Sequence, residues 1–225
     1  KKLMYEKISS REKLLVETAN FIHGGFIVGW FQGALEFGPR ALGNRSILAS
    51  ATNPMMQQKL NLKIKYREGF RPFAPVVLQD ELEKVFEFDR PSPYMLFTAN
   101  IKKGFRKTLP LNFNIRTWEE KLKTPKSDFP AITHVDFSAR LQTVHKETNP
   151  LFHDLLAAYR GLSGTSIMVN TSFNVRGEPI VQSPEDAINC FLNTEMDILV
   201  IGNYLVQKAK QEKQGEIGGG KFADD

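Results

Sequence analysis

The apolar run 26–31 is followed at once by the turn-rich segment 33–46, GALEFGPRALGNRS, and this combination constrains the fold most strongly. An uninterrupted apolar run of this length is typical of a buried strand. The segment after it contains three glycines, one proline and two arginines. A strand that ends in such a loop presents backbone N–H groups and guanidinium groups at one place, which suits a phosphate or a carboxylate. The sequence therefore predicts a buried strand that leads into an anion-binding loop.

A second group of cations lies in the segment 65–75, KYREGFRPFAP. Lys65 and Arg71 are six residues apart around Gly69, so both side chains could face one pocket. The alternative is a solvated charge cluster in which Glu68 neutralises its neighbours. We expect Arg67 to be the structural partner of Glu68 and not a group that binds a ligand.

Two further arginines follow turn or strand patterns. Arg40 comes directly after Gly38 and Pro39, where proline fixes the backbone and glycine allows close approach to a ligand. An ordinary surface arginine in a turn would look the same. Arg140 lies in an extended pattern, and alternation places it on the same strand face as Ser138 and Gln142. An arginine among apolar strand residues needs an anion, because an unpaired buried charge is costly.

Polar side chains alternate just beyond residues 165–169, which we predict to form a buried strand. They are Asn170, Ser172 and Asn174, and we place Ser172 in a loop at the end of a core strand. Polar groups at a strand end commonly line a site, but capping of a simple turn explains them equally well. Both interpretations stay open at this point.

Four segments together resemble the C-terminal half of the NodU/CmcH-type O-carbamoyltransferases, namely 38–48 (GPRALGNRSIL), 65–75 (KYREGFRPFAP), 138–144 (SARLQTV) and 170–180 (NTSFNVRGEPI). They occur in order, and the resemblance runs from about residue 26 to 208. Short alternating strands and helices alone predict an α/β or α+β fold with antiparallel pairs. The resemblance implies a YrdC-like fold, which is a twisted, mostly antiparallel sheet flanked by helices with a basic concave pocket.

The resemblance also implies an activity, the ATP-dependent activation of a carbamoyl group. Carbamoyl phosphate loses its phosphate to leave carbamate, which attacks the α-phosphate of ATP and gives carbamoyladenylate and pyrophosphate. The family's catalytic positions fall here on Lys65, Arg71, Arg140 and Ser172. The implied set for binding substrate and ATP is Arg40, Lys65, Arg71, Arg140, Asn170, Ser172 and Asn174. Mg²⁺ is expected as the companion of ATP, because metal ions commonly bridge phosphate oxygens.

In the full family this region follows an N-terminal domain that resembles sugar kinases and actin-like ATPases. That domain holds a metal site where the carbamoyl group passes to an acceptor hydroxyl, and it is the expected partner. The chain does not begin with Met, and its four histidines, His23, His134, His145 and His153, form no H-x-x-x-H pattern. We therefore expect a piece of a longer protein that performs the activating step, lacks the transfer step and has no metal site of its own.

A net charge of +5 also allows a rival class, a YrdC-like module that binds RNA. Phe70, Phe73 and Phe105 lie among the cations and could stack on bases. The cations cluster in turns beside glycine and proline, however, and do not form a stripe, so nucleic acid is the less favoured partner. A third possibility is a docking domain with a vestigial pocket, against which the retained polar positions argue.

We predict one domain over residues 1–210, with a long loop or insertion at 101–130, and a disordered tail at 211–225. Cys190 is the single cysteine and lies in an apolar helical pattern, which predicts a buried thiol. No apolar stretch approaches the roughly 18 residues of a transmembrane helix. The first residues do not resemble a signal peptide. A cytoplasmic location is the expectation that follows.

Periodicity and capping signals locate the elements. Asn53 and Asn149 each precede a proline, and Ser183 begins a capping pattern with Asp186. We predict helices at 10–23, 53–62, 80–86, 149–159 and after Ser183, and strands at 26–31, 46–50, 73–78, 94–99, 131–135, 140–144, 165–170, 196–201 and 203–208.

Overall fold

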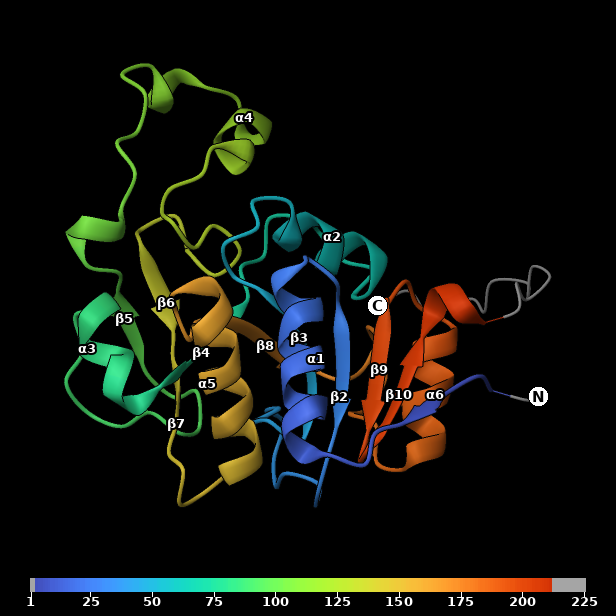
Figure 1. Cartoon of the computed structure of the whole chain (residues 1–225). Helices are drawn as coiled ribbons and strands as arrows, with labels where there is room; N and C mark the ends of the chain where they lie inside the picture. The colour runs from blue at the N-terminus through green and yellow to red at the C-terminus, as the bar shows by residue number, and fades with distance from the viewer. Residues whose placement is uncertain (1–2, 212–225) are drawn as a thin grey trace.

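The computed structural model describes residues 3–211, apart from the side chain of Leu122. Its centre is a sheet of eight strands, in the order β1-β10-β9-β2-β3-β8-β4-β7 (Figure 1). All neighbours pair antiparallel except β2 with β9 and β4 with β7. The strands are β1 (Glu6–Lys7), β2 (Val28–Phe31), β3 (Arg45–Ser50), β4 (Ala74–Leu78), β7 (Gln142–Val144), β8 (Met168–Ser172), β9 (Ile198–Ile201) and β10 (Tyr204–Gln207). A separate two-stranded sheet pairs β5 (Thr98–Asn100) with β6 (Ser138–Arg140).

Helices cover both faces of the large sheet. α1 (Arg11–His23) and α5 (Pro150–Ser163) lie side by side on one face (Figure 1). Their apolar side chains pack on Val28, Trp30 and Leu48 in one buried cluster. α2 (Met56–Lys63), α3 (Leu82–Val85) and α6 (Pro184–Leu192) contribute to a second buried cluster. The architecture is therefore a mostly antiparallel sheet flanked by helices, as the family resemblance implied.

The predicted starts of three helices are confirmed, two of them predicted from capping signals and that of α1 from its apolar periodicity. Ser10 accepts a hydrogen bond from the backbone N–H of Lys13 at the start of α1. Asn149 caps α5 in the same way, with a proline at the first position. Ser183 and Asp186 form a reciprocal capping box at the start of α6. These predicted helix starts are confirmed because each depends on a local hydrogen bond that a few residues specify.

Several predicted elements are wrong or displaced. Residues 131–135 do not form a strand; the Thr133 hydroxyl instead donates to the carbonyl of Phe129 in a turn. The strand expected at 94–99 is reduced to β5, and the one expected at 140–144 is divided between β6 and β7. α2 begins at Met56 and not after Asn53, whose side chain accepts from the N–H of Met55 in the preceding turn.

The region predicted as a loop at 101–130 contains short helices. They are η2 (Lys103–Phe105), η3 (Phe113–Ile115) and α4 (Trp118–Lys123). Thr117 and Glu120 form a capping box for α4, and this T-x-x-E pattern could have been found in the sequence. We call residues 107–126 the arm, because this segment projects from the body of the molecule (Figure 1). Its base is closed by a backbone hydrogen bond from Lys107 to Lys126.

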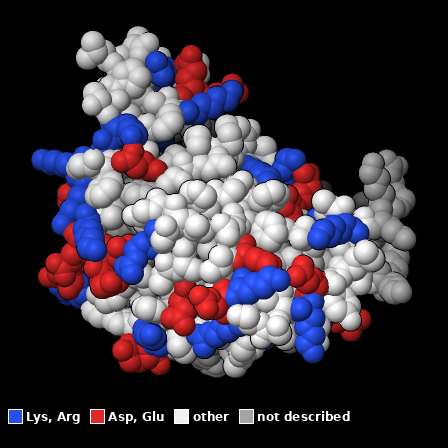
Figure 2. Space-filling view, in the orientation of Figure 1, with Lys and Arg blue, Asp and Glu red and all other residues white. Residues whose placement is uncertain are grey.

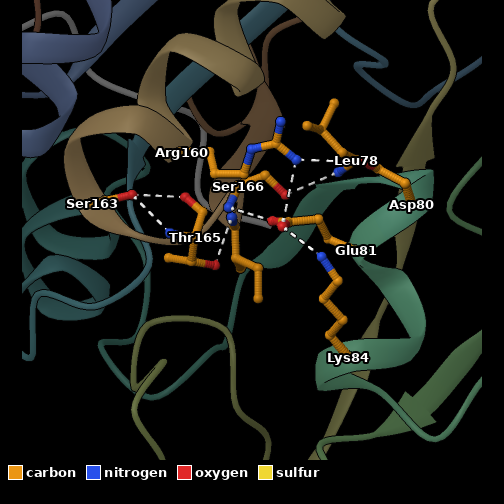
Figure 3. Close-up of polar contacts among 9 residues, drawn as sticks. Leu78, Asp80, Glu81, Lys84, Arg160, Ser163, Thr165 and Ser166 are labelled. Carbon is orange, nitrogen blue, oxygen red and sulfur yellow. Dashed lines mark hydrogen bonds and ion pairs between the residues drawn. The ribbon is translucent and has the colours of Figure 1, made fainter.

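The loop before β8 is tied to the 3-10 helix η1 (Gln79–Glu81) by a polar cluster (Figure 3). A carboxylate oxygen of Glu81 accepts from the backbone N–H of Ser166 at 3.1 Å. The other oxygen pairs with Lys84 at 3.3 Å and with Arg160 at 3.5 Å. This cluster is internally paired and has a structural role, so the polar groups at the far end of β8 are the ones to examine as a site.

The predictions about the C-terminal tail and about membrane-spanning helices can be compared with the described residues. The tail predicted to be disordered lies outside the described residues, except for Gln211. Among residues 3–211, none of the helices has the length and apolar content that crossing a membrane requires.

Candidate functional site

A cavity of about 470 Å³ lies where β8 and β6 end, and it gathers most of the predicted site residues. Among the residues that the structure describes, no Asp or Glu lines it. Its polar lining residues are Arg40, Arg67, Arg71, Thr98, His134, Ser138, Arg140, Asn170, Thr171 and Ser172. We call it the arginine cavity. A concave site with four guanidinium groups and no lining carboxylate suits an anion with several charges.

One of the two half-buried guanidinium groups belongs to Arg140, the last residue of β6. Its Nε atom is buried and has no hydrogen-bond partner. Burial, and then the nearby charge of Arg40, lowers the pKa of Arg140 below its usual range. An unsatisfied donor next to a like charge is unfavourable until an anion arrives.

Arg40 is carried by the loop between β2 and β3, and this loop is organised by a carboxylate. One oxygen of Glu36 accepts backbone N–H groups from Leu42 at 2.8 Å, from Asn44 at 2.6 Å and from Arg45 at 3.3 Å. The Arg40 side chain stays exposed at the cavity wall. The loop is therefore fixed from inside while its arginine faces the cavity.

The other arginine of that loop has a different role. Arg45 is buried, and its guanidinium donates to the carbonyls of Gln32, Gly33 and Asn44. It also stacks over the ring of Phe31, 3.6 Å from the centroid. The expectation that the loop presents both arginines to an anion is therefore wrong for Arg45, which binds backbone oxygens instead.

The loop between α2 and β4 supplies two arginines. The Nε of Arg71 pairs with Glu68 at 3.0 Å, so the expected pairing of Glu68 with Arg67 is wrong. Arg67 instead donates to Asn61 at 2.7 Å and lies 4.9 Å from the ring centroid of Phe73. Because Arg67 also lines the cavity, sequence analysis missed a candidate residue. The three cations of 65–75 were the sequence signal for an anion site, but which of their side chains face the cavity depends on contacts with residues far away in the sequence.

Lys65 does not line the arginine cavity. It is only 5% exposed, and it borders a neighbouring cavity of about 270 Å³. Its ammonium lies 2.6 Å from the carbonyl of Ser172 and 2.8 and 2.9 Å from the side-chain and backbone oxygens of Asn174. Three oxygens at these distances use the three donors of an ammonium. In this conformation Lys65 therefore holds the end of β8 and has no donor left for a ligand.

Ser172 lies in β8 itself and not in a loop after the strand, because β8 extends two residues beyond the predicted end. Its hydroxyl donates to the side-chain oxygen of Asn174 at 2.7 Å, while Lys65 lies 3.3 Å from the hydroxyl oxygen. The single proton of this hydroxyl is already used. Ser172 lines both the arginine cavity and the neighbouring one, whereas Asn174 lines only the neighbouring one of these two.

Asn170 connects β8 to the Arg40 loop. Its side-chain nitrogen donates to the carbonyl of Ala41 at 3.1 Å and to Gln142 at 2.6 Å. Its side-chain oxygen is buried without a partner. Gln142 donates in turn to the carbonyl of Leu42 at 2.8 Å and does not line the cavity, so its expected shared face with Arg140 is wrong. The chain changes direction at Leu141 between β6 and β7, which ends the alternation.

The buried position of Lys65 predicts a pH dependence of stability. Burial, and secondarily the charge of Arg67, lowers its pKa from 10.5 to about 7. Below pH 7 the folded and unfolded chains both bind this proton, so Lys65 does not make the free energy of unfolding depend on pH there. Between pH 7 and about 10.5 the unfolded chain binds more protons, and the free energy of unfolding rises with pH. From pH 6.5 to pH 9 this gain is on the order of 2 kcal/mol.

Urea unfolding of the parent chain and of Lys65→Met at both pH values measures this contribution. We expect Lys65→Met to lose this gain and to keep only the smaller rise in the free energy of unfolding that Lys208 gives above pH 8, because burial lowers the pKa of Lys208 to about 8. Lys208→Met is the comparison variant: it keeps Lys65, so it should retain the Lys65 gain and lose only the smaller one. An equal gain in the parent chain and in Lys65→Met would contradict the assignment.

The histidines and the single cysteine differ in their relation to the site. His134 lines the cavity, and its Nδ1 lies 3.2 Å from Asp136. His145 is not among the lining residues. Within residues 3–211 no group of three His, Cys, Asp or Glu side chains could hold a metal ion. Cys190 is buried as predicted, and burial raises the pKa of its thiol to about 12.

Comparisons with known proteins identify the family of the chain. The family model described as carbamoyltransferase C-terminus matches residues 19–208. An uncharacterised protein of Synechocystis is 53% identical over 91% of the chain and 33% of its own length. Nodulation protein NolO of Bradyrhizobium diazoefficiens is 41% identical over 89% of the chain and 34% of its own length. The 3'-hydroxymethylcephem-O-carbamoyltransferase of Amycolatopsis lactamdurans is 35% identical over 86% of the chain and 33% of its own length. The chain spans about a third of the length of these relatives.

Solved structures give the fold. YciO of E. coli superposes with a TM-score of 0.55 at 14% identity, covering 89% of this chain and 83% of that one. HypF of T. kodakarensis superposes with a TM-score of 0.50 at 20% identity, covering 86% of this chain and 20% of that one. The expected YrdC-like fold is confirmed by these similarities, which at such identities concern the fold alone.

Proposed function

Because this chain belongs to the carbamoyltransferase C-terminal family, we propose that it is the carbamoyl-activating domain of an O-carbamoyltransferase. ATP and carbamoyl phosphate would bind in the arginine cavity. The observation that carries this proposal is the convergence of Arg40, Arg67, Arg71 and Arg140 on one cavity without a lining carboxylate among the described residues. Two phosphorylated substrates need several charge-assisted partners, and this cavity offers them.

The proposed reaction has two steps. Water cleaves carbamoyl phosphate to carbamate and inorganic phosphate, and a carbamate oxygen then attacks the α-phosphorus of ATP. Pyrophosphate leaves, and carbamoyladenylate remains. The arginines would hold the phosphates in place and stabilise the charge that develops on the transferring group. The unpaired oxygen of Asn170 is an acceptor that suits the N–H groups of a carbamoyl group.

Lys65 takes an indirect role in this proposal, and Ser172 a direct one. The ammonium of Lys65 fixes the backbone at Ser172 and Asn174, and the cavity wall keeps its shape because this end of β8 is tied down. Ser172 would contact a ligand through its hydroxyl oxygen, or as a donor after releasing Asn174.

Mg²⁺ would enter with ATP. The cavity lining contains no Asp or Glu in the part of the chain that is described, so the residues fit a metal held by phosphate oxygens and water and not by protein carboxylates. Bound in that way, the ion would neutralise phosphate charge.

Transfer of the carbamoyl group to an alcohol is assigned to another part of the protein. We propose that a kinase-like or actin-like N-terminal domain with its own metal site completes the reaction and selects the acceptor. This chain covers about a third of the length of nodulation protein NolO and of the cephem O-carbamoyltransferase, which leaves room for such a domain.

The direct test is product formation. The chain is incubated with Mg-ATP and carbamoyl phosphate, and AMP and pyrophosphate are quantified. We expect both products only when both substrates are present. The absence of AMP when calorimetry shows that both substrates bind would refute the activating step, and the absence of any binding would refute the whole assignment.

Arg40→Ala is expected to weaken Mg-ATP binding about tenfold to a hundredfold, because one charge-assisted contact to a phosphate is worth about 1.5–3 kcal/mol. Isothermal titration calorimetry measures the dissociation constant. Arg90→Ala is the control, since Arg90 is exposed, pairs with Asp89 and does not line the cavity. An unchanged constant in Arg40→Ala would remove Arg40 from the site.

The rival RNA-binding function is less well supported. On the face drawn in Figure 2, basic and acidic side chains are intermingled and form no continuous basic stripe. The site arginines line a cavity instead of a strip of surface. RNA binding would weaken steeply as salt rises. A titration with single-stranded RNA at two salt concentrations separates the two functions.

A further inference from the structure

Among the described residues that line the arginine cavity, His134 differs chemically from all the others. The other polar residues of the lining are arginines, serines, threonines and one asparagine. None of these side chains takes up a proton near neutral pH. An imidazole does, because it changes its charge in the physiological range of pH. His134 is therefore the described lining residue that can exchange a proton with a ligand or with a water.

His134 begins a tight turn that leads into β6. The backbone N–H of His134 donates to the carbonyl of Ser138 at 2.9 Å, and that of Phe137 donates to the carbonyl of His134 at 3.1 Å. Phe137 has a φ of +65°, in the left-handed region that bulky residues rarely adopt. The two hydrogen bonds hold this strained backbone, and such strain clusters at functional sites.

The carboxylate of Asp136 organises two side chains of this turn. One of its oxygens accepts the hydroxyl proton of Ser138 at 2.6 Å and the backbone N–H of Ser138 at 3.0 Å. The same oxygen lies 3.2 Å from Nδ1 of His134. The hydrogen bonds from Ser138, and to a smaller extent the contact with His134, lower the pKa of Asp136. This carboxylate is therefore ionised and can only accept.

An ionised Asp136 decides which nitrogen of His134 carries the proton. Nδ1 must be the donor in this contact, so in the neutral ring Nε2 has a free electron pair. Among residues 3–211 no group is hydrogen-bonded to Nε2. His134 lines the cavity and Asp136 does not, so Nε2 is the nitrogen left for the cavity. The Ser138 hydroxyl, whose proton goes to Asp136, likewise offers only its oxygen there.

We propose that His134 is the general base that activates the water which cleaves carbamoyl phosphate. This inference rests on the proposed function and adds a catalytic residue to its first step. A water at this wall would donate one hydrogen to Nε2 and the other to the Ser138 oxygen. Its own electron pair would then be free for a substrate that the arginines hold.

The proposed step is a hydrolysis. The water oxygen bonds to the phosphorus of carbamoyl phosphate, the bridging P–O bond breaks, and carbamate leaves with the electron pair of that bond. A water proton passes to Nε2, and the imidazolium, which the Asp136 carboxylate stabilises, then releases it to solvent. We assign the attack to phosphorus because guanidinium groups on the phosphoryl oxygens reduce the repulsion that an incoming electron pair meets there.

A purely structural role for the imidazole is less consistent with its surroundings. The side chain of His134 is 51% exposed, so it contributes little to packing. The hydrogen bonds that close the turn use its backbone and the Ser138–Asp136 contacts, not the ring. The fold should therefore tolerate replacement of this side chain.

The test separates the two chemical steps through the source of carbamate. The parent chain, His134→Gln and His153→Gln receive Mg-ATP with either carbamoyl phosphate or ammonium carbamate, which bypasses the hydrolysis. Phosphate release and AMP formation are measured. Glutamine keeps a donor for Asp136 but takes up no proton. His134→Gln should lose about a hundredfold or more of both activities with carbamoyl phosphate, and it should form AMP from carbamate as fast as the parent chain.

His153→Gln is the matched control. His153 also contacts a carboxylate, that of Asp154 at 3.3 Å, but it does not line the arginine cavity. This variant should equal the parent chain with both carbamate sources. Calorimetry should give unchanged dissociation constants for Mg-ATP and carbamoyl phosphate in His134→Gln. Added imidazole should restore part of the hydrolysis in His134→Ala, which it would not do if the ring only supported the fold.

The outcomes distinguish this inference from the proposed function. Normal hydrolysis in His134→Gln, or an equal loss with carbamoyl phosphate and with carbamate, would overturn the general base. AMP formation by the parent chain from carbamate but not from carbamoyl phosphate would also overturn it, while the adenylating step would stand. AMP formation from neither source would refute the proposed function.

Discussion

Arg140→Met is expected to reduce Mg-ATP affinity about a hundredfold without destabilising the folded chain. The guanidinium Nε is buried without a partner, and Arg40 is a nearby like charge. A ligand phosphate would satisfy this donor, and a charge-assisted bond in a confined site lies at the strong end of the usual range. Without ligand the same group is unfavourable, so methionine of similar length should leave the melting temperature equal or slightly higher.

The two readouts are calorimetry with Mg-ATP and thermal unfolding without ligand. Arg11→Met is the matched control: Arg11 lies on α1, pairs with Asp154 at 2.8 Å, and does not line the arginine cavity. We expect unchanged ATP affinity in this control. A large fall in melting temperature for Arg140→Met would indicate a structural arginine and would contradict the argument from the unpaired donor.

The opposite signs expected for binding and stability are typical of a preorganised site. Side chains held close to like charges reduce the stability of the free protein and increase the gain when an anion binds. Arg45, at the end of the loop that carries Arg40, shows a contrasting case. Its two terminal nitrogens donate to backbone carbonyls, although its Nε is also buried without a partner, and the side chain does not line the arginine cavity, so Arg45 contributes to the fold.

Helices were predicted better than strands, for a local reason. Ser10, Asn149 and Ser183 each specify a helix start through a hydrogen bond within three residues. Strand ends depend on partners far away in sequence. β8 extends to Ser172 because β3 continues to pair with it, from Ser50 opposite Met168 to Ser46 opposite Ser172. No feature of residues 165–172 alone contains that information.

The sequence identified most of the cationic residues of the candidate site, but it did not show which of them face the cavity and which stabilise the fold. Turn residues beside Arg40 and Arg71, and the extended apolar surroundings of Arg140, indicated an anion site, and the structure brings these three arginines together. The sequence could not show that Lys65 is directed at Ser172 and Asn174, because its acceptors are 107 or more residues away. Arg67 was assigned to Glu68 because they are adjacent, whereas the fold offers it Asn61 and Phe73.

The second large effect concerns Gly43, in the same loop as Arg40. Gly43→Ala is expected to destabilise the chain by about 4 kcal/mol or more, or to prevent folding. A Cβ atom at this position would lie 2.2 Å from a ring carbon of Phe152, and φ is +118°. Phe152 is fully buried in α5, and Trp30 donates its indole N–H to the Gly43 carbonyl at 2.9 Å. Neither the ring nor the loop can move without disturbing the core.

Gly38→Ala separates the steric clash from the backbone strain. Gly38 has a similar φ of +104°, but a Cβ there meets no atom within 4 Å, so only the strain of about 1–2 kcal/mol remains. Gly104→Ala, with neither strain nor contact, should be nearly neutral. Urea unfolding of the three variants should give this order. If Gly43→Ala and Gly38→Ala were equally stable, the contact with Phe152 would not limit this loop. Replacing Phe152 by Leu in the Gly43→Ala background should recover part of the loss, because the smaller side chain relieves the clash at the cost of packing.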